Sequence, residues 1–115
     1  MINLDYQSRT PIYEQIVNEI ERFVVLGILK PNEQISSIRE MATNLGINPN
    51  TVKKAYEELE NRGTIITIST KGSFIADKTD DVFKRKIKEK INAIKQEICE
   101  LEKMGVTKEE ILKKI

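Results

Sequence analysis

The sequence contains no histidine, no tryptophan and one cysteine, Cys99. These shortages remove the Cys/His sets that hold structural zinc, the Ser/His and Cys/His pairs of nucleophilic catalysis, and any disulfide framework within the chain. The sequence also lacks a glycine-rich phosphate loop. We therefore expect a protein that is not an enzyme and that holds no metal and no cofactor. Two interpretations of Cys99 remain: a disulfide between two chains, or a partly buried thiol.

Long hydrophobic runs are also missing, because no stretch approaches the ~18 apolar residues of a membrane span. The first residues, Met1 to Asp5, lack the basic and then apolar regions of a secretory signal. We expect a cytoplasmic protein with no membrane partner. A length of 115 residues, 39% apolar and 32% charged, fits one modest helix-rich core with an appendage.

A strong positive charge is absent as well, since the formal net charge is only +1. Residues 1–76 contain eight Lys/Arg and nine Asp/Glu, a net charge of −1. Any affinity for phosphate must then come from where the cations lie. The pattern predicts a polarised surface with many acids on it, namely Glu14, Glu19, Glu21, Glu57, Glu58 and Glu60.

Apolar residues recur at helical spacing from Ile12 to Val24. This predicts a core helix that has Pro11 in its first turn and stops before Gly27. A turn at residues 29–32 and a short strand at Gln34-Ile35 are expected to follow.

Ser37 and Glu40 have the spacing of a capping box, which predicts a second helix from this point to the turn at Gly46. Its apolar face is Ile38, Met41, Ala42 and Leu45, and Ile47 fills the angle before the next helix. A capping box alone indicates a helix and says nothing about DNA.

A third helix opens at Asn48, which can cap it, with Pro49 at the first helical position. Periodicity turns Val52, Ala55, Tyr56 and Leu59 inward before Gly63 ends the helix. The outward side chains suit base edges and phosphates, although a solvated polar face is the alternative. They are Asn50, Thr51, Lys53 and Lys54.

Two β-prone runs, residues 64–68 and 73–76, flank a turn at residues 69–72 in which Gly72 suits a positive φ. They predict a hairpin with Lys71 at its tip, and a hairpin that merely covers the core is the alternative. The order of parts predicts a mainly α fold with a small β wing, that is, a winged helix-turn-helix at residues 1–76.

Residues 77–115 are predicted to form a helical dimerisation tail, and packing of this tail on its own domain is the alternative. Residues 77–81 form a polar joint in which Asp80 or Asp81 can cap a long helix, Gly105 ends it, and Thr107 with Glu110 begins a short last one. Apolar residues at alternating spacings of 4 and 3 form a seam that one helix cannot bury alone. They are Ile87, Ile91, Ile94, Ile98 and Leu101.

Two further groups in the tail have weaker assignments. The seam fits either a two-stranded or an antiparallel helical pair, and Ile111, Leu112 and Ile115 can fold back on it. A basic cluster is assigned to solvent rather than to DNA flanks. It comprises Lys84, Arg85, Lys86, Lys88 and Lys90.

A family resemblance covers about two thirds of the chain. The segments at residues 11–16, 27–31, 37–42, 47–52 and 71–75 resemble the DNA-binding domain of GntR-type bacterial transcription regulators. Three features are similar to the YtrA subfamily: the segment Asn48-Pro49-Asn50-Thr51, residues 55–60, and a short tail in place of a ligand domain. Each fragment alone is weak, and the combination is specific.

The resemblance implies that Arg39, Asn50, Thr51, Lys53, and Lys71 with Gly72 contact operator DNA. With the caps Ser37 and Asn48 and with Lys54, these residues form the candidate DNA-binding site. Two departures bear on the loop before the second helix: Asn32 stands where the family often has Gly, and Ile35-Ser36-Ser37 replaces Leu-Pro-Ser. Pro49 stands where many relatives carry a basic side chain, which shifts base readout toward Asn48, Asn50 and Lys53.

The expected function is sequence-specific regulation of transcription, as a repressor that binds an inverted-repeat operator on double-stranded DNA as a homodimer. The resemblance suggests operons for transporters of the cell envelope type. A non-regulatory DNA-binding accessory protein and a protein-interaction module on the same fold are the alternatives. The sequence names neither an operator nor an effector ligand, and it offers no obvious pocket larger than a groove between helices.

Overall fold

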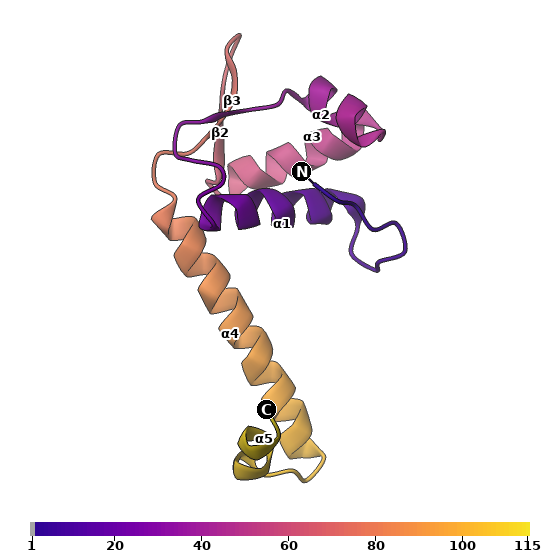
Figure 1. Cartoon of the computed structure of the whole chain (residues 1–115), viewed down its shortest axis with the longest axis vertical. Helices are drawn as coiled ribbons and strands as arrows, with labels where there is room; N and C mark the ends of the chain where they lie inside the picture. The colour runs from indigo at the N-terminus through magenta and orange to yellow at the C-terminus, as the bar shows by residue number, and fades with distance from the viewer. Residues whose placement is uncertain (1) are drawn as a thin grey trace. The chain divides into compact units, whose positions relative to one another are not determined.

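A computed structural model describes residues 2–115, so that Met1, the first residue of the predicted domain 1–76, lies outside the described part. The elements follow the order of a winged helix-turn-helix with two further helices (Figure 1). They are α1 (Ile12–Val25), β1 (Gln34–Ile35), α2 (Ile38–Leu45), α3 (Pro49–Asn61), β2 (Ile65–Ile68), β3 (Gly72–Ile75), α4 (Asp80–Lys103) and α5 (Lys108–Lys114). The predicted fold class, mainly α with a small β wing, is confirmed.

The chain divides into two compact units, Met1–Phe83 and Lys84–Ile115. The division falls beyond the predicted boundary between residues 76 and 77 because the first turn of α4 belongs to the first unit, where Val82 is 1% exposed within the core. Asp77 also belongs to this unit, since its Oδ1 accepts a 2.6 Å hydrogen bond from Nδ2 of Asn32.

The core of the first unit lies where α1, α3 and the sheet meet, and α2 packs on α3 (Figure 1). The inward faces predicted from helical spacing are buried, with Ile16, Val52 and Leu59 fully enclosed. Burying such side chains supplies about 25 cal/mol per Å² of apolar surface, which is the main stabilising contribution for a unit of this size. Among residues 2–115, no helix has both the length and the apolar character needed to cross a membrane.

The sheet is antiparallel with strand order β1-β3-β2. Ile65 pairs with Ile75 on the buried face, whereas Ile66 and Ile68 point to the other face and stay exposed. The short strand predicted at Gln34-Ile35 is present as β1, paired with Phe74 and Ser73 of β3.

The hairpin tip differs from the expected four-residue turn. Because Ile68 pairs with Gly72, the tip has three residues, 69–71, and Thr70 takes a left-handed conformation with φ of 67°. Gly72 has φ of 120°, and a Cβ there would lie 2.8 Å from Nε2 of Gln34. That Nε2 donates a 2.9 Å hydrogen bond to the carbonyl of Lys71. Gly72 is required by its φ, whereas a Cβ would only displace the flexible end of the Gln34 side chain from this hydrogen bond.

Two turn assignments are corrected, and the departure at Asn32 is explained. Pro11 is the N-cap of α1, with ψ of 148°, and not a residue of its first turn. Asp80 and Asp81 lie inside the first turn of α4, and the carbonyl of Thr79 precedes them as acceptor for the amides of Val82 and Phe83. Asn32 has φ of 67°, which explains the departure from Gly, because Asn tolerates the left-handed region better than most residues.

The second unit consists of the rest of α4 and of α5. The chain turns at Gly105, with φ of 90°, and Oγ1 of Thr107 accepts the amide of Glu110 at 3.2 Å, as the capping box predicts. Ile111 is buried, whereas Leu112 and Ile115 are 68% and 88% exposed, so only the first of the three residues expected to fold back is covered. Cys99 is exposed, which corrects the expectation of a partly buried thiol.

Candidate nucleic-acid interface

The position of α3 in the first unit depends on Tyr56. Its hydroxyl donates a 2.7 Å hydrogen bond to the carbonyl of Ser36, just before α2, and the side chain is 2% exposed. Burial raises the pKa of the Tyr56 phenol far above its ordinary value, so the group remains a donor. This bond ties the third helix to the start of the second, and it therefore fixes the helix-turn-helix angle.

The start of α2 is capped as predicted, since Oγ of Ser37 accepts the amide of Glu40 at 3.1 Å. Arg39 is the second residue of the helix and is exposed. The N-terminal turn also concentrates the positive end of the helix dipole, which favours phosphate. Arg39 and the amides of this turn can therefore meet a nucleic acid together.

The start of α3 carries the most polar exposed surface of the candidate site. Oδ1 of Asn48 accepts the amide of Asn50 at 2.8 Å, and Pro49 is the first helical residue. Because its oxygen caps the helix, Asn48 has its amide group left for another partner. Asn50 and Lys53 are exposed and Thr51 is half-buried.

Lys54 points toward the first helix instead of away from the core. Its Nζ lies 4.1 Å from the centre of the Tyr13 ring, a distance typical of a cation–π contact. The hydroxyl of Tyr13 in turn donates a 3.1 Å hydrogen bond to Glu14, which raises the pKa of the Tyr13 phenol. The ammonium of Lys54 is thus held beside α1.

At the wing, Lys71 is exposed at the tip and Gly72 is half-buried. The hydrogen bond from Gln34 to the carbonyl of Lys71 braces the tip against β1. The wing therefore presents one cation on a backbone held at both strands.

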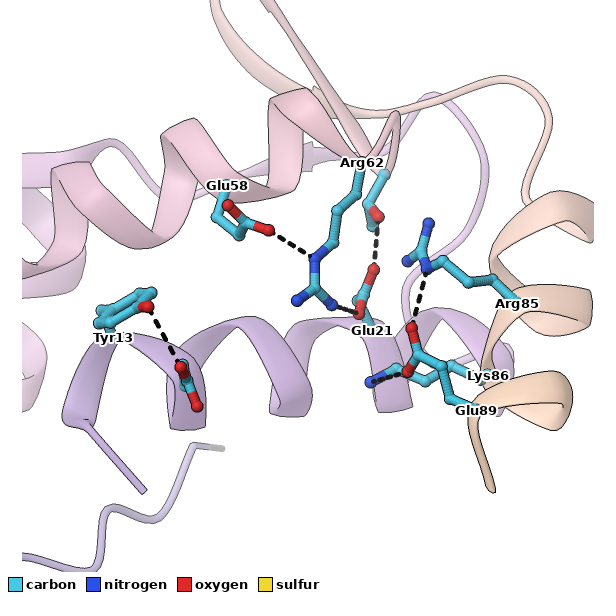
Figure 2. A network of polar contacts seen from close by, with 9 residues as sticks. Tyr13, Glu21, Glu58, Arg62, Arg85, Lys86 and Glu89 are labelled. Atoms are coloured by element: carbon cyan, nitrogen blue, oxygen red, sulfur yellow. Dashed lines mark hydrogen bonds and ion pairs between the residues drawn. The ribbon is translucent and has the colours of Figure 1, made fainter. Parts of the chain in front are cut away.

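The chain's buried ionic network was missed by sequence reasoning. Glu21, which we placed among surface acids, is 0% exposed. Its two oxygens accept a 2.9 Å bond from Nη1 of Arg62 and a 2.7 Å bond from Oγ1 of Thr64 (Figure 2). The signal was in the spacing, because Glu21 lies four residues after Val17 and three before Val24, on the buried side of α1.

Arg62 joins this network to α3 through a 2.9 Å bond from its Nε to Oε1 of Glu58 (Figure 2). Burial lowers the pKa of Arg62, but its hydrogen bonds and charge contacts with Glu58 and Glu21 outweigh that effect and raise it overall. The guanidinium stays charged and links α1 to the end of α3, and Glu21 extends the network to Thr64, the residue before β2. It is therefore a structural cation and not part of the DNA-facing set.

In the second unit, the predicted seam is largely open. Ile87, Ile91 and Ile94 are 46%, 47% and 57% exposed. Ile98 is half-buried and Leu101 is 36% exposed. An exposed apolar stripe of this extent on a single helix is typical of an interaction surface.

Two hollows bear on small-molecule binding. A groove of about 380 Å³ lies between α4 and α5 and is lined by residues from Lys95 to Leu112. A second, of about 280 Å³, lies in the first unit beside Phe23, Leu29 and Met41. The second was not expected from the sequence, because its walls come from α1, β1 and α2 together.

Residues 12–75 match the family model described as bacterial regulatory proteins of the gntR family. The chain is 40% identical over 101 residues to the HTH-type transcriptional repressor YtrA of Bacillus subtilis, which covers 88% of this chain and 75% of that protein.

Solved structures give the same assignment. A transcriptional regulator from Oenococcus oeni superposes with a TM-score of 0.83 at 39% identity, over 98% of this chain and 94% of that one. The DNA-binding domain of AraR in complex with the operator ORE1 superposes with a TM-score of 0.57 at 25% identity, over 66% of this chain and 93% of that one.

Proposed function

The chain belongs to the GntR family of bacterial regulatory proteins, a family of DNA-binding transcription regulators that are not enzymes, and on that premise we propose that it is a repressor. In this proposal it binds an inverted-repeat operator as a homodimer through α4. Bound in this way, it excludes RNA polymerase from the promoter.

One observation carries the proposal: the capped start of α3 exposes Asn50 and Lys53, and Lys71 is exposed at the tip of the wing. Polar side chains on a helix of this diameter fit the major groove, and a cation on a hairpin tip fits the adjacent phosphates or the minor groove. The name of the relative YtrA as a repressor, and the complex of AraR with an operator, support the same reading.

The roles of individual residues follow from position and chemistry. Arg39, with its planar fork, is assigned to a guanine edge or a phosphate. Asn50 and Thr51 are assigned to base edges or phosphates, and Lys53 and Lys71 are assigned to phosphates. Ser37 and Asn48 cap their helices and direct amides toward the backbone.

Lys54 takes a lesser role in this scheme, because its ammonium lies on the Tyr13 ring. It contributes charge at the edge of the interface and does not reach into the groove. Gly72 contributes the positive φ that the turn of the wing requires.

The test is a selection of bound fragments from genomic DNA with the full-length protein, repeated at two salt concentrations. The expected result is enrichment of an inverted repeat, with affinity that falls steeply as salt rises. In Arg39→Ala, loss of a bidentate base contact should cost about 1–3 kcal/mol and relax one position of each half-site. Arg22→Ala, on the exposed side of α1, is the matched control.

Other outcomes separate the alternatives. Binding without sequence preference would point to a non-regulatory accessory protein. Absence of salt-dependent binding would point to a protein-interaction module. Repression itself is tested with a reporter under the selected operator, where loss of the protein should raise expression.

A further inference from the structure

The tip of the wing contains a residue in a strained backbone conformation. Among residues 2–115, two residues other than glycine have a positive φ, Asn32 and Thr70, and both have φ of 67°. A left-handed backbone is costly for a β-branched residue, because the substituents on Cβ crowd the main chain. Such conformations persist only where the surrounding structure imposes them, and they often occur at functional sites.

The two residues differ in what their side chains do for the fold. Asn tolerates the left-handed region, and Nδ2 of Asn32 also donates a 2.6 Å hydrogen bond to Oδ1 of Asp77. The Thr70 side chain is exposed, and its hydroxyl makes no hydrogen bond to any of residues 2–115. Folding therefore accounts for the side chain of Asn32, whereas it gives no reason for a branched side chain at Thr70.

The turn at the wing tip explains why the backbone of Thr70 is left-handed. The amide of Lys71 donates a 3.0 Å hydrogen bond to the carbonyl of Ile68, so residues 68–71 form a β-turn with Ser69 and Thr70 at its centre. Of these two central residues, Thr70 alone has a positive φ. This order of signs matches a type II turn, whose third residue is usually Gly or Asn. The tip thus carries a β-branched residue where the turn favours an unbranched one.

The backbone on both sides of Thr70 is held in place. Ile68 pairs with Gly72, and Nε2 of Gln34 donates a 2.9 Å hydrogen bond to the carbonyl of Lys71. A β-branched side chain also has few accessible rotamers. The hydroxyl and the methyl group of Thr70 are therefore presented in a nearly fixed arrangement, and binding them to a partner costs little conformational entropy.

The dimensions of the wing tip suit the minor groove of DNA. The major groove, about 12 Å wide, is assigned to α3 in the proposed function, and the neighbouring minor groove is about 6 Å wide. Because the two strands of a hairpin are about 4.8 Å apart, a hairpin with its side chains is too broad to enter so narrow a groove except at its tip. Thr70 is the central residue of that tip, and Lys71 beside it is exposed and suits the phosphates at the rim of the groove.

We propose that Thr70 enters the minor groove and selects A·T over G·C at the base pair beneath the wing. Both kinds of pair offer acceptors in this groove, and G·C adds the N2 amino group of guanine. The Thr70 hydroxyl can donate to an acceptor of either pair, whereas its methyl group occupies the space that the amino group needs. Selection by exclusion of this kind is a common source of specificity. The inference rests on the proposed function, since it requires the wing to meet the operator, and it adds a residue that determines specificity.

The test uses the full-length protein and DNA fragments selected from a random library. Two operators that differ only by A·T or G·C at the enriched pair beneath the wing are then titrated by fluorescence anisotropy. The wild type should prefer A·T about fivefold. Thr70→Gly and Thr70→Ser each remove the methyl group and should reduce this preference to within about twofold. Thr70→Val keeps the branched shape without the hydroxyl, so it should bind both operators less tightly and keep the preference.

Urea unfolding in the absence of DNA separates a role in binding from a role in folding. Thr70→Gly should raise the unfolding midpoint, because glycine adopts a positive φ without steric strain. Thr70→Val keeps the strain and should unfold near the wild-type midpoint. A glycine variant that is more stable and less selective would show that Thr70 serves binding at the expense of stability. A midpoint below that of the wild type would show that Thr70 stabilises the turn, and it would overturn the inference.

The neighbouring cation provides the matched control for base selection. Lys71→Ala removes a phosphate contact and should weaken binding to the A·T and G·C operators by the same factor. If Thr70→Gly also weakened binding to both operators equally, or selected the same fragments as the wild type, Thr70 would not select the base pair and the inference would be wrong, with the proposed function intact. Absence of any enriched operator for the wild type would overturn the proposed function itself.

Discussion

The winged unit, residues 2–83, buries most of the apolar residues of its helices, whereas the tail, residues 84–115, leaves most of its apolar seam exposed. In residues 2–83 the inward faces of α1 and α3 meet each other and the sheet, and side chains such as Ile16 and Leu59 are fully buried. In α4 the seam has the same helical regularity but remains about half exposed at Ile87, Ile91 and Ile94. A regular apolar pattern therefore predicts burial, while the partner that supplies it can be the same chain or another one.

The two regions differ equally in their charges. The winged unit encloses one ionic network around Glu21, where an unmatched charge would be costly. The tail keeps Lys90 and Glu97 in solvent, where an ion pair contributes little to stability. Four experiments test this contrast.

The largest effect is expected from charges placed in the open seam. Ile91→Asp combined with Ile94→Asp should make the protein monomeric, because two carboxylates cannot be buried without partners. Losing the second DNA-binding unit should lower operator affinity on the order of 10²–10⁴-fold. Gel-shift titration measures this loss, and Asn92→Asp, on the outer face, should bind like the wild type. Unchanged dimerisation in the double variant would show that the seam is not the interface.

The next effect concerns the enclosed network of the winged unit. Arg62→Ala removes one charged partner of the buried Glu21 carboxylate and should reduce the free energy of unfolding by about 2–3 kcal/mol, less than for a fully buried pair because Arg62 keeps 29% of its side chain exposed. Urea unfolding at fixed protein concentration measures it. Arg22→Ala breaks the exposed pair with Glu19 and should leave the midpoint unchanged. If Arg62→Ala and Arg22→Ala had the same unfolding midpoint, the burial of Glu21 would not make its ion pair with Arg62 more stabilising than an exposed pair.

A smaller effect is expected at Tyr56, which links α3 to the segment before α2. Tyr56→Phe should cost about 1 kcal/mol, because the carbonyl of Ser36 loses its donor. Folding raises the pKa of this phenol, so its contribution is complete below the unfolded value of about 10 and is lost as the pH rises through the folded value. The phenylalanine variant should therefore show a weaker loss of stability in alkaline solution. If the free energies of unfolding of the wild type and of Tyr56→Phe fell equally with rising pH, the claim that folding raises the pKa of the Tyr56 phenol would be wrong.

The smallest effect is expected from single cations of the DNA-facing surface. Lys53→Ala and Lys71→Ala should each weaken binding severalfold for all sequences. Because the homodimer loses one phosphate contact in each copy, each variant should reduce the magnitude of the slope of log K against log salt by about two. Lys54→Ala should change that slope less, because its ammonium lies on Tyr13. Fluorescence anisotropy at four salt concentrations gives the three slopes. If Lys54→Ala changed the salt slope more than Lys53→Ala did, Lys54 and not Lys53 would be the main phosphate contact of α3.

Local chemistry made several features predictable from the sequence. The caps at Ser37, Asn48 and Thr107 depend on residues two or three positions apart, and all three have the expected hydrogen bonds. The interior face of α3 followed from helical spacing, and Val52, Ala55, Tyr56 and Leu59 are buried. The candidate DNA-binding residues were named from position and from the family resemblance, and their roles remain predictions.

Contacts between distant segments could not be read in the same way. Glu21 meets Thr64 across 43 positions, and the Gln34 side chain braces Lys71 across 37, while no local pattern encodes either pairing. Lys54 lies on an outward position of α3 by spacing, but a ring from α1 holds its ammonium.

By itself the sequence determined the capped starts of α2, α3 and α5, which helix faces are apolar and that α4 carries more apolar surface than one helix can bury. These properties depend on neighbours within one or two turns. Only the tertiary structure decided which charges are enclosed, how the wing tip is braced and which residues of α4 and α5 line the groove between them. Those outcomes depend on side chains that meet through folding, and their energies exist only once water has been excluded between them.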